Sequence, residues 1–230
     1  MRRALLDALR AQRVAKQPVV LVTELATGRQ ELIRPQEREP APDPTRLEHA
    51  LEALRRDRCA ILDERGGPVF VQPFNPPLRL VLVGAVHIAQ ELARMAAEVG
   101  YAVVVVDPRP AFATQERFER ATLSQEWPDA ALRALAPDPR TAIAVLSHDP
   151  KLDEPALDVA LRSEAFYVGA LGSRRSHGAR CRRLRERGFG AADLARVHGP
   201  IGLDIGAQSP AEIAVSILAE ITRALRQARA

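Results

Sequence analysis

The chain has 230 residues, of which 47% are hydrophobic, 27% are charged and only 4% are aromatic. This length and composition are typical of one large or two modest domains with a packed core. The few aromatic residues argue against stacking platforms for single-stranded nucleic acid. The net charge is +4, and the excess is mostly arginine, which suits a phosphate group or an acidic protein surface.

Targeting and cysteine patterns predict a cytoplasmic protein. The opening Met-Arg-Arg is followed by an amphipathic pattern, so we expect no signal peptide. The apolar runs are too short to span a bilayer, and we expect no membrane partner. Cys59 and Cys181 lie far apart without metal-ligand spacing, so each is predicted to be a small hydrophobic residue of a reduced protein.

Residues 1–77 are predicted to form a small α+β domain in which a helix and a hairpin occur twice. The predicted segments are helix 2–14, hairpin 19–33, helix 47–54 and hairpin 59–71. The repeated order is consistent with one duplicated unit. The proline-rich connector at 73–77 marks the predicted domain boundary.

An apolar run at 80–83 ends in Gly84, and a helical pattern follows at once and ends at Gly100. A second apolar run, at 102–106, ends in Asp107. Strand, tight turn, helix and strand, with an acid at the tip of the second strand, are typical of the opening unit of a dinucleotide-binding fold.

The alternation of strands and helices continues to the end of the chain. The further predicted elements are helix 126–135, strand 141–146, helix 152–161, strand 166–171, a helix ending at Arg187, and a last helix that starts at the capping box 209–212. Such alternation implies a parallel sheet with right-handed crossovers. The sequence therefore predicts an α/β protein, with a Rossmann-like parallel-sheet domain at 78–230 after the smaller α+β domain.

Polar motifs follow five of the predicted strands. Ligands of such sheets bind outside the carboxyl ends of the strands, so we expect these motifs to meet in one crevice. The candidate cofactor-binding residues are Gly84, Ala85, Val86, His87, Asp107, Arg109, His148, Lys151, Gly172, Ser173, Arg174, Arg175, Gly202 and Asp204.

The glycine fingerprint for a nicotinamide cofactor is incomplete. Val86 stands where the second glycine is expected, and its Cβ crowds the space that a pyrophosphate needs. Asp107 could bond a ribose or another diol, or it could form a local pair with Arg109. His87 could donate to a ligand phosphate, or it could serve only as a helix-entry residue.

Ser173, Arg174 and Arg175 form the strongest single ligand motif, because helix-start amides and two guanidinium groups together make an anion site. Further along, Arg180, Arg183 and Arg187 share one helix face. We expect that face to be exposed, either as a solvated surface or as a docking surface for an acidic partner. Double-stranded nucleic acid is a weaker option, because no binding motif accompanies the arginines.

The glycine-rich stretch at 199–206 precedes the last helix. It predicts a backbone with positive φ or a close approach of ligand, and a tight connecting loop is the alternative. No metal site is predicted, since His148 and its neighbours do not match a zinc spacing, and Asp149 with Pro150 could cap the next helix. We find no Gly-x-Ser-x-Gly elbow, no cysteine beside a histidine and no Walker loop, and we therefore expect no catalytic residue.

Six motifs occur in a characteristic order: Gly-Ala-Val-His-Ile-Ala-Gln at 84–90, Asp-Pro-Arg-x-x-Phe-Ala at 107–113, Glu-Arg-Phe at 116–118, His-Asp-Pro-Lys at 148–151, Gly-Ala-Leu-Gly-Ser-Arg-Arg at 169–175 and His-Gly-Pro-Ile-Gly-Leu-Asp-Ile-Gly-Ala at 198–207. Together they resemble the xanthine dehydrogenase accessory protein family (XdhC/CoxI) over about residues 78–222.

The resemblance implies a chaperone rather than an enzyme. Such a protein holds the molybdenum cofactor (molybdopterin), protects it during sulfuration and delivers it to a molybdenum hydroxylase apoenzyme such as xanthine dehydrogenase. A cysteine desulfurase that sulfurates the cofactor is a further implied partner, and a homodimer stays open. The resemblance also implies a Rossmann-like carboxyl-terminal domain.

Residues 1–77 lack the Gly-Gly-Cys-type motif that is usual in the amino-terminal domain of this family, and Val86 stands where members often have glycine. Two alternatives therefore stay open. One is an NAD(P)-dependent oxidoreductase, against which Val86 and the missing catalytic dyad both count. The other is a partner-docking accessory protein with a degenerate ligand site.

Overall fold

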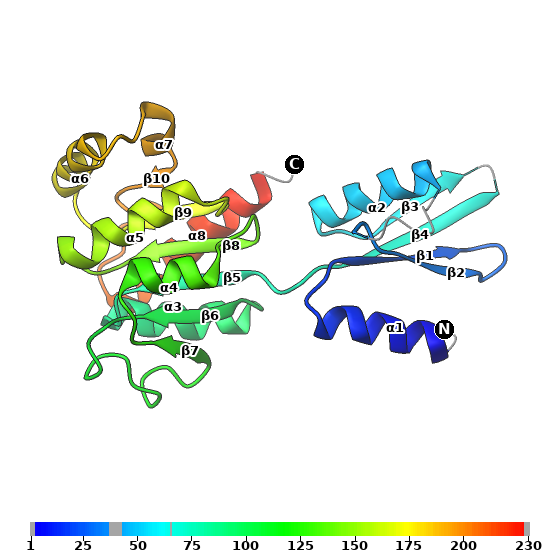
Figure 1. Cartoon of the computed structure of the whole chain (residues 1–230), viewed down its shortest axis with the longest axis horizontal. Coiled ribbons are helices and arrows are strands. Elements are labelled where there is room, and N and C mark those ends of the chain that lie inside the picture. The colour runs from blue at the N-terminus through cyan, green and yellow to red at the C-terminus, as the bar shows by residue number, and fades with distance from the viewer. Residues whose placement is uncertain (1–2, 37–42, 65, 228–230) are drawn as a thin grey trace. The chain divides into compact units, whose positions relative to one another are not determined.

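The structure is a computed structural model that describes residues 3–36, 43–64 and 66–227 (Figure 1). The chain divides into two compact units between Pro76 and Pro77. The elements of the first unit are α1 (Arg3–Val14), β1 (Val19–Glu24), β2 (Gln30–Ile33), α2 (Pro44–Arg56), β3 (Ala60–Glu64) and β4 (Gly67–Phe74).

The second unit alternates strands and helices. Its elements are β5 (Arg79–Val83), α3 (His87–Glu98), β6 (Ala102–Val106), β7 (Ala121–Ser124), α4 (Pro128–Leu135), β8 (Thr141–Val145), α5 (Pro150–Arg162), β9 (Tyr167–Ala170), α6 (Arg174–Glu186), α7 (Ala191–Ala195), β10 (Val197–His198) and α8 (Pro210–Gln227).

The first unit is an antiparallel sheet in the order β2-β1-β4-β3, with α1 and α2 on opposite sides of it (Figure 1). Residues 19–22 of β1 are all buried, because both faces of this central strand are covered. A helix and a hairpin do occur twice in the order of elements. However, the first hairpin contributes its first strand to the sheet centre and the second hairpin its second strand, so a duplicated unit stays a prediction.

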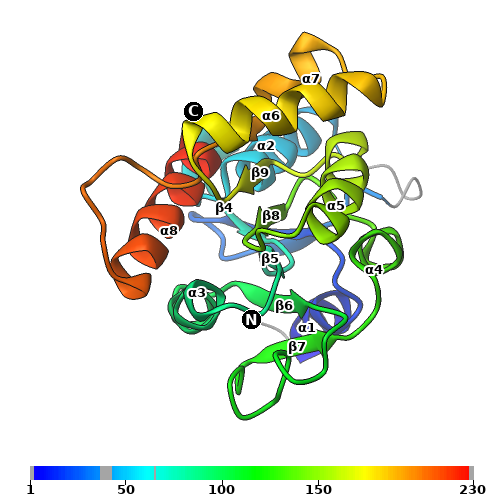
Figure 2. The same cartoon turned by 90° about the vertical axis from the view of Figure 1, so that its left-hand side faces the viewer.

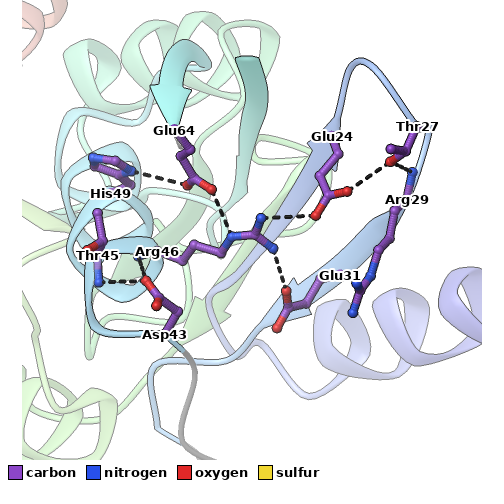
Figure 3. Close-up of polar contacts among 9 residues, drawn as sticks. All are labelled: Glu24, Thr27, Arg29, Glu31, Asp43, Thr45, Arg46, His49 and Glu64. Carbon is purple, nitrogen blue, oxygen red and sulfur yellow. Dashed lines mark hydrogen bonds and ion pairs between the residues drawn. The ribbon is translucent and has the colours of Figure 1, made fainter. Parts of the chain in front are cut away.

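Arg46 of α2 links the helix to three strands of this sheet (Figure 3). Its guanidinium group donates hydrogen bonds of 3.0 Å to each of Glu24 of β1, Glu31 of β2 and Glu64 of β3. The hydrogen bond from Arg46 is the main cause that lowers the pKa of Glu24 from its ordinary value. Asp43 caps the same helix by accepting from the Thr45 amide at 3.0 Å. One half-buried arginine thus ties α2 to three strands of the sheet.

The second unit contains a six-stranded sheet in the order β10-β9-β8-β5-β6-β7, and every neighbouring pair is parallel. The first strand, β5, is central. The chain runs outward through β6 and β7 and then returns to add β8 on the other side of β5. This is the Rossmann strand order, with its topological switch point between β5 and β8. The predicted fold class is confirmed.

Helices cover both faces of this sheet (Figure 2). Leu80 and Leu82 pack in one layer with α3 and α8, whereas Val81 and Val83 pack in the other with α4 and α5. All four side chains are fully buried, which explains why the central strand is a continuous apolar run rather than an alternating one.

Three elements of the second unit were not predicted: β7, α7 and β10. The edge strand β7 is half-exposed and carries no continuous apolar run. The other two contain five and two residues, which is too short for a periodic pattern. The predicted helix 126–135 in fact begins at Pro128, directly after its cap residue Trp127.

Candidate functional site

The candidate site lies at the carboxyl edge of the parallel sheet, where the polar motifs after β5, β6, β8 and β9 come together. The turn after β5 closely approaches the end of β8: a Cβ built on Gly84 would lie 2.9 Å from the Ser147 amide nitrogen. Gly84 also has a φ of +100°, which side-chain-bearing residues rarely adopt. Glycine is therefore needed at position 84, because the backbone angle disfavours a side chain and the end of β8 leaves no space for one. That these strand ends bind a ligand stays a prediction.

Asp107 at the end of β6 is fully buried and completely engaged within the chain. Oδ2 accepts from the Ala85 amide at 2.8 Å and from Arg109 Nη2 at 2.7 Å, and Oδ1 accepts from the Arg109 amide at 3.0 Å and from Nε at 2.8 Å. Burial alone would raise the pKa of Asp107, but the Arg109 and backbone hydrogen bonds outweigh it and lower the pKa. These contacts fill the roughly four acceptor positions of a carboxylate. The structure thus shows the local pair with Arg109 and leaves no acceptor for a ribose diol.

Val86 and His87 occupy the start of α3. Val86 is the cap residue, with φ −84° and ψ 173°, and its half-buried side chain packs against the apolar layer beneath α3. His87 is the first helical residue and is exposed. A branched apolar side chain therefore stands at the position where the fingerprint needs a glycine.

The residues after β8 combine a helix cap with exposed polar groups. Asp149 caps α5 by accepting from the Lys151 amide at 2.9 Å, and Pro150 is the first helical residue, so the predicted cap is confirmed. The side chains of His148 and Lys151 are exposed. Among the residues that the structure describes, no group of three or more metal-ligating side chains comes together.

A buried polar network lies between β8, β9, α5 and α6. The Ser147 hydroxyl donates to Asp153, whose pKa burial raises above its ordinary value. Arg180 donates to the Leu171 carbonyl at 2.8 Å, and the same nitrogen lies 3.6 Å from Asp153. Arg180 is only 5% exposed, so the prediction that it lies on an exposed basic face was wrong.

The other two arginines of that predicted face are also engaged. Arg183 donates to Glu154 of α5, and Arg187 donates to the other oxygen of the same carboxylate at 3.1 Å. Arg183 and Arg187 keep 42% of their side chains exposed while they pair with α5, so only Arg180 of this predicted face is buried. The exposed arginines of α6 that have no ion pair with a described residue are Arg174, Arg175, Arg182 and Arg185.

The start of α6 has the geometry of an anion site. Gly172, with φ +136°, turns the chain after β9, and Ser173 caps the helix by accepting from the Ser176 amide at 3.2 Å. The amides of Arg174 and Arg175 lie in the first turn, where no helical carbonyl is available to them. Both arginines are exposed on this first turn, and an anion site that combines their charge with these amides stays a prediction.

The glycine-rich loop after β10 is held against α8. The Gly202 amide donates to Glu220 at 2.8 Å, and the Tyr167 hydroxyl donates to the same carboxylate oxygen at 2.6 Å. Gly202 has a φ of +95°, and a Cβ there would collide with Ser216 of α8. The predicted positive φ is therefore confirmed, and the backbone at Gly202 lies close to helix α8. A close approach of ligand to this loop stays a prediction. Asp204 is exposed.

A contact between a cysteine and a histidine escaped the sequence interpretation, which found no such pair. Cys181 Sγ lies 3.4 Å from His177 Nε2 on α6. The two residues are four positions apart, a spacing that places side chains on the same helix face. The i, i+4 spacing was the signal that could have revealed this pair.

Comparisons with known proteins agree with this architecture. Residues 80–221 match the model of the XdhC Rossmann domain. A solved structure described as a xanthine dehydrogenase from Bacillus halodurans superposes with a TM-score of 0.74 at 25% identity, over 98% of this chain and 65% of that one. None of the helices in the described ranges has the length and apolar character to cross a membrane.

Three curated relatives are similar in sequence. YqeB of Escherichia coli K12, an uncharacterised protein, is 36% identical over 81% of this chain, and a probable xanthine dehydrogenase subunit of Bacillus subtilis 168 is 35% identical over 66%. The molybdenum cofactor insertion chaperone PaoD of Escherichia coli K12 is 31% identical over 64%. The matches span only 34%, 44% and 40% of these relatives, respectively.

The family model covers more than half of the chain. It extends from β5 into α8 and so includes the six-stranded sheet. The strand order, the switch-point glycine and the motifs at the strand ends all lie within the matched residues. The chain therefore belongs to the XdhC family, the xanthine dehydrogenase accessory proteins.

Proposed function

We propose that this protein is a chaperone that binds the molybdenum cofactor as transient cargo and assists its insertion into xanthine dehydrogenase or a related molybdenum hydroxylase. Family membership and the name of the relative PaoD support this role. The observation that carries the binding step is the start of α6, where Ser173, Arg174 and Arg175 present free amides and two guanidinium groups.

The chemistry of the cargo suits this geometry. The cofactor carries a phosphate and a polar pterin ring system. The phosphate would lie at the first turn of α6, where charge-assisted hydrogen bonds are available. The exposed side chains of His148 and Lys151, at the end of the neighbouring strand β8, would face the polar ring. None of these contacts requires a reaction centre, which agrees with an accessory role.

The proposed partner surface consists of the exposed arginines of α6 that lie outside the proposed phosphate site. Arg182 and Arg185 are exposed and lie beyond the proposed phosphate site on the same helix. We propose that they meet an acidic surface of the apoenzyme, since charge complementarity guides encounter and orientation. A cysteine desulfurase is a second proposed partner, and a homodimer remains an option.

The test of the proposed function is to purify the protein from cells that make the cofactor and to measure bound pterin by fluorescence after oxidation. We expect about one pterin per chain, and none in protein from cells that cannot make the cofactor. Capture of the apoenzyme without any bound pterin would support instead a docking protein with a degenerate ligand site. Absence of both pterin and capture would contradict the proposal.

NADH is expected not to bind at micromolar concentrations. Val86 crowds the pyrophosphate position, and Asp107 has no acceptor left for the ribose. Titration of the protein into NADH, followed by nicotinamide fluorescence, measures the affinity. Val86→Gly is the matched variant, because it removes only the crowding side chain. A dissociation constant in the micromolar range for the parent protein would support the oxidoreductase alternative.

A further inference from the structure

We infer that a buried pair of charges, Arg180 of α6 and Asp153 of α5, tunes the anion site at the start of α6. Arg180 adds positive charge close to the first turn of the helix, and Asp153 cancels this charge until its carboxylate takes up a proton. The inference rests on the proposed phosphate site, and it assigns a regulatory role to two residues that lie outside that site.

Arg180 lies against the turn that leads from β9 into α6. Its Nη2 donates to the Leu171 carbonyl at 2.8 Å, and a Cβ built on Gly172 would lie 3.8 Å from the same nitrogen. Ser173, the next residue, caps α6, so the guanidinium group lies close to the free amides of the first turn. Arg180 is only 5% exposed, and its buried Nη1 has no hydrogen-bond partner among the described residues. A buried donor without an acceptor favours negative charge nearby.

Asp153 is the counter-charge of this guanidinium group. Its Oδ2 lies 3.6 Å from Arg180 Nη2, which is an ion pair longer than a hydrogen bond, and its Oδ1 accepts from the Ser147 hydroxyl. Burial raises the pKa of Asp153, and the Ser147 hydrogen bond and the neighbouring charges offset this effect only in part. Asp153 therefore takes up a proton at a higher pH than an ordinary aspartate does.

The charged groups that act on Asp153 come from two elements besides α5. Arg180 comes from α6, and His148 follows β8. On α5 itself, the next residue, Glu154, pairs instead with two arginines further along α6. Arg180 is the buried cation within ion-pair distance of the Asp153 carboxylate, whereas His148 is exposed. A change in the charge of Asp153 therefore acts mainly on Arg180 and on the turn that it contacts.

An anion at the first turn of α6 and a proton on Asp153 stabilise each other. Protonation removes the negative charge beside Arg180, so the potential at the helix start becomes more positive and the anion binds more tightly. By reciprocity, a bound anion favours the protonated form of Asp153 to the same extent. The site therefore holds an anionic cargo more tightly at lower pH and releases it more readily as the pH rises.

The experiment uses sulfate, which keeps two negative charges from about pH 8 to about pH 5, whereas a phosphate group changes its own charge in this range. Sodium sulfate is titrated at constant ionic strength into isotope-labelled protein, and the amide resonances of residues 173–176 report the affinity. Asp153→Asn keeps the shape of the side chain without its charge. At pH 7 we expect this variant to bind sulfate about threefold or more tightly than the parent, and the difference should narrow as the pH falls.

The sign of this effect separates tuning from a purely structural role. If Asp153 were only a structural partner of Arg180, its replacement would loosen the turn and weaken the binding of sulfate. Equal or weaker binding by Asp153→Asn at pH 7 would therefore overturn the inference and leave the anion site in place. If residues 173–176 did not respond to sulfate in either protein, both the inference and the proposed phosphate site would be contradicted.

Glu154→Gln is the matched control, because it removes a buried negative charge from the same helix, away from the turn that Arg180 contacts. Its affinity for sulfate should stay within about twofold of the parent. An equal gain in this control would show a general effect of net charge and overturn the inference. His148 and His177 are unchanged in every variant, so their own titration contributes equally to all of them.

A double variant tests the contribution of Arg180. Arg180→Gln combined with Asp153→Asn removes the whole pair, so we expect the affinity for sulfate at pH 7 to return to about that of the parent. A double variant that binds as tightly as Asp153→Asn alone would contradict a charge contribution from Arg180. Should the double variant fail to fold, the pH dependence of the single variant still decides.

Discussion

Replacement of Arg174 and Arg175 by alanine is expected to lower the affinity for the molybdenum cofactor at least about tenfold, which corresponds to about 1.4 kcal/mol. A charge-assisted hydrogen bond contributes about 1.5–3 kcal/mol, so loss of a single phosphate contact would already reach this size. Both side chains are exposed at the start of α6 and form no ion pair with a described residue. Thermal stability should therefore change little.

The measurement is the pterin retained by the purified protein after gel filtration at several dilutions. Arg182→Ala with Arg185→Ala is the matched control, since it removes the same charge from the same helix away from its start. The control should retain the cofactor like the parent. Equal retention by both double variants would show that the anion site lies elsewhere. Equal loss in both would mean that net charge, not the helix start, holds the cargo.

Gly84→Ala is expected to destabilise the second unit by about 3–5 kcal/mol. The φ of +100° is strained for alanine, which contributes about 1–3 kcal/mol, and the new Cβ would lie 2.9 Å from the Ser147 amide nitrogen, a backbone atom that cannot move without shifting β8. Because β5 and β8 are neighbouring central strands, the displacement would open the switch point as well as weaken the fold.

The substitution Gly100→Ala separates the effect of backbone strain on stability from the effect of the collision with Ser147. Gly100 has a similar φ of +92°, but a Cβ there meets no atom within 4 Å. This control should show only the backbone strain, about 1–3 kcal/mol. Urea unfolding can be followed by the fluorescence of Trp127, the single tryptophan of the chain, which reports on the second unit. Equal destabilisation by the two substitutions would contradict the proposed collision with β8.

The sequence by itself determined the architecture of the second unit. A strand covered on both faces must be apolar at every position, and residues 80–83 and 102–106 are continuous apolar runs. The glycine after the first run and the helical spacing after it predicted the strand–helix–strand unit. Handedness rules for parallel crossovers then restricted the topology, and the observed parallel sheet confirmed the fold class.

Only the tertiary structure decided what the acid at the tip of β6 does. The sequence placed Asp107 at a strand end, but its two oxygens are filled by Arg109 and by the Ala85 amide, which lies 22 residues earlier in the chain. The same sequence pattern fits a carboxylate that is free to bind a ligand and one whose oxygens already accept hydrogen bonds from the chain. Which of the two occurs depends on how the turns after β5 and β6 pack against each other.

Helix α6 shows most clearly which features the sequence predicts and which ones only the packing decides. Helical spacing alone predicted that Arg180, Arg183 and Arg187 share a face. Arginines occur around most of this helix, however, so the sequence contains no apolar stripe that identifies the buried side. Packing decided that Arg180 is buried beside Asp153, whereas Arg183 and Arg187 stay 42% exposed and pair with Glu154, because a buried carboxylate requires paired cations.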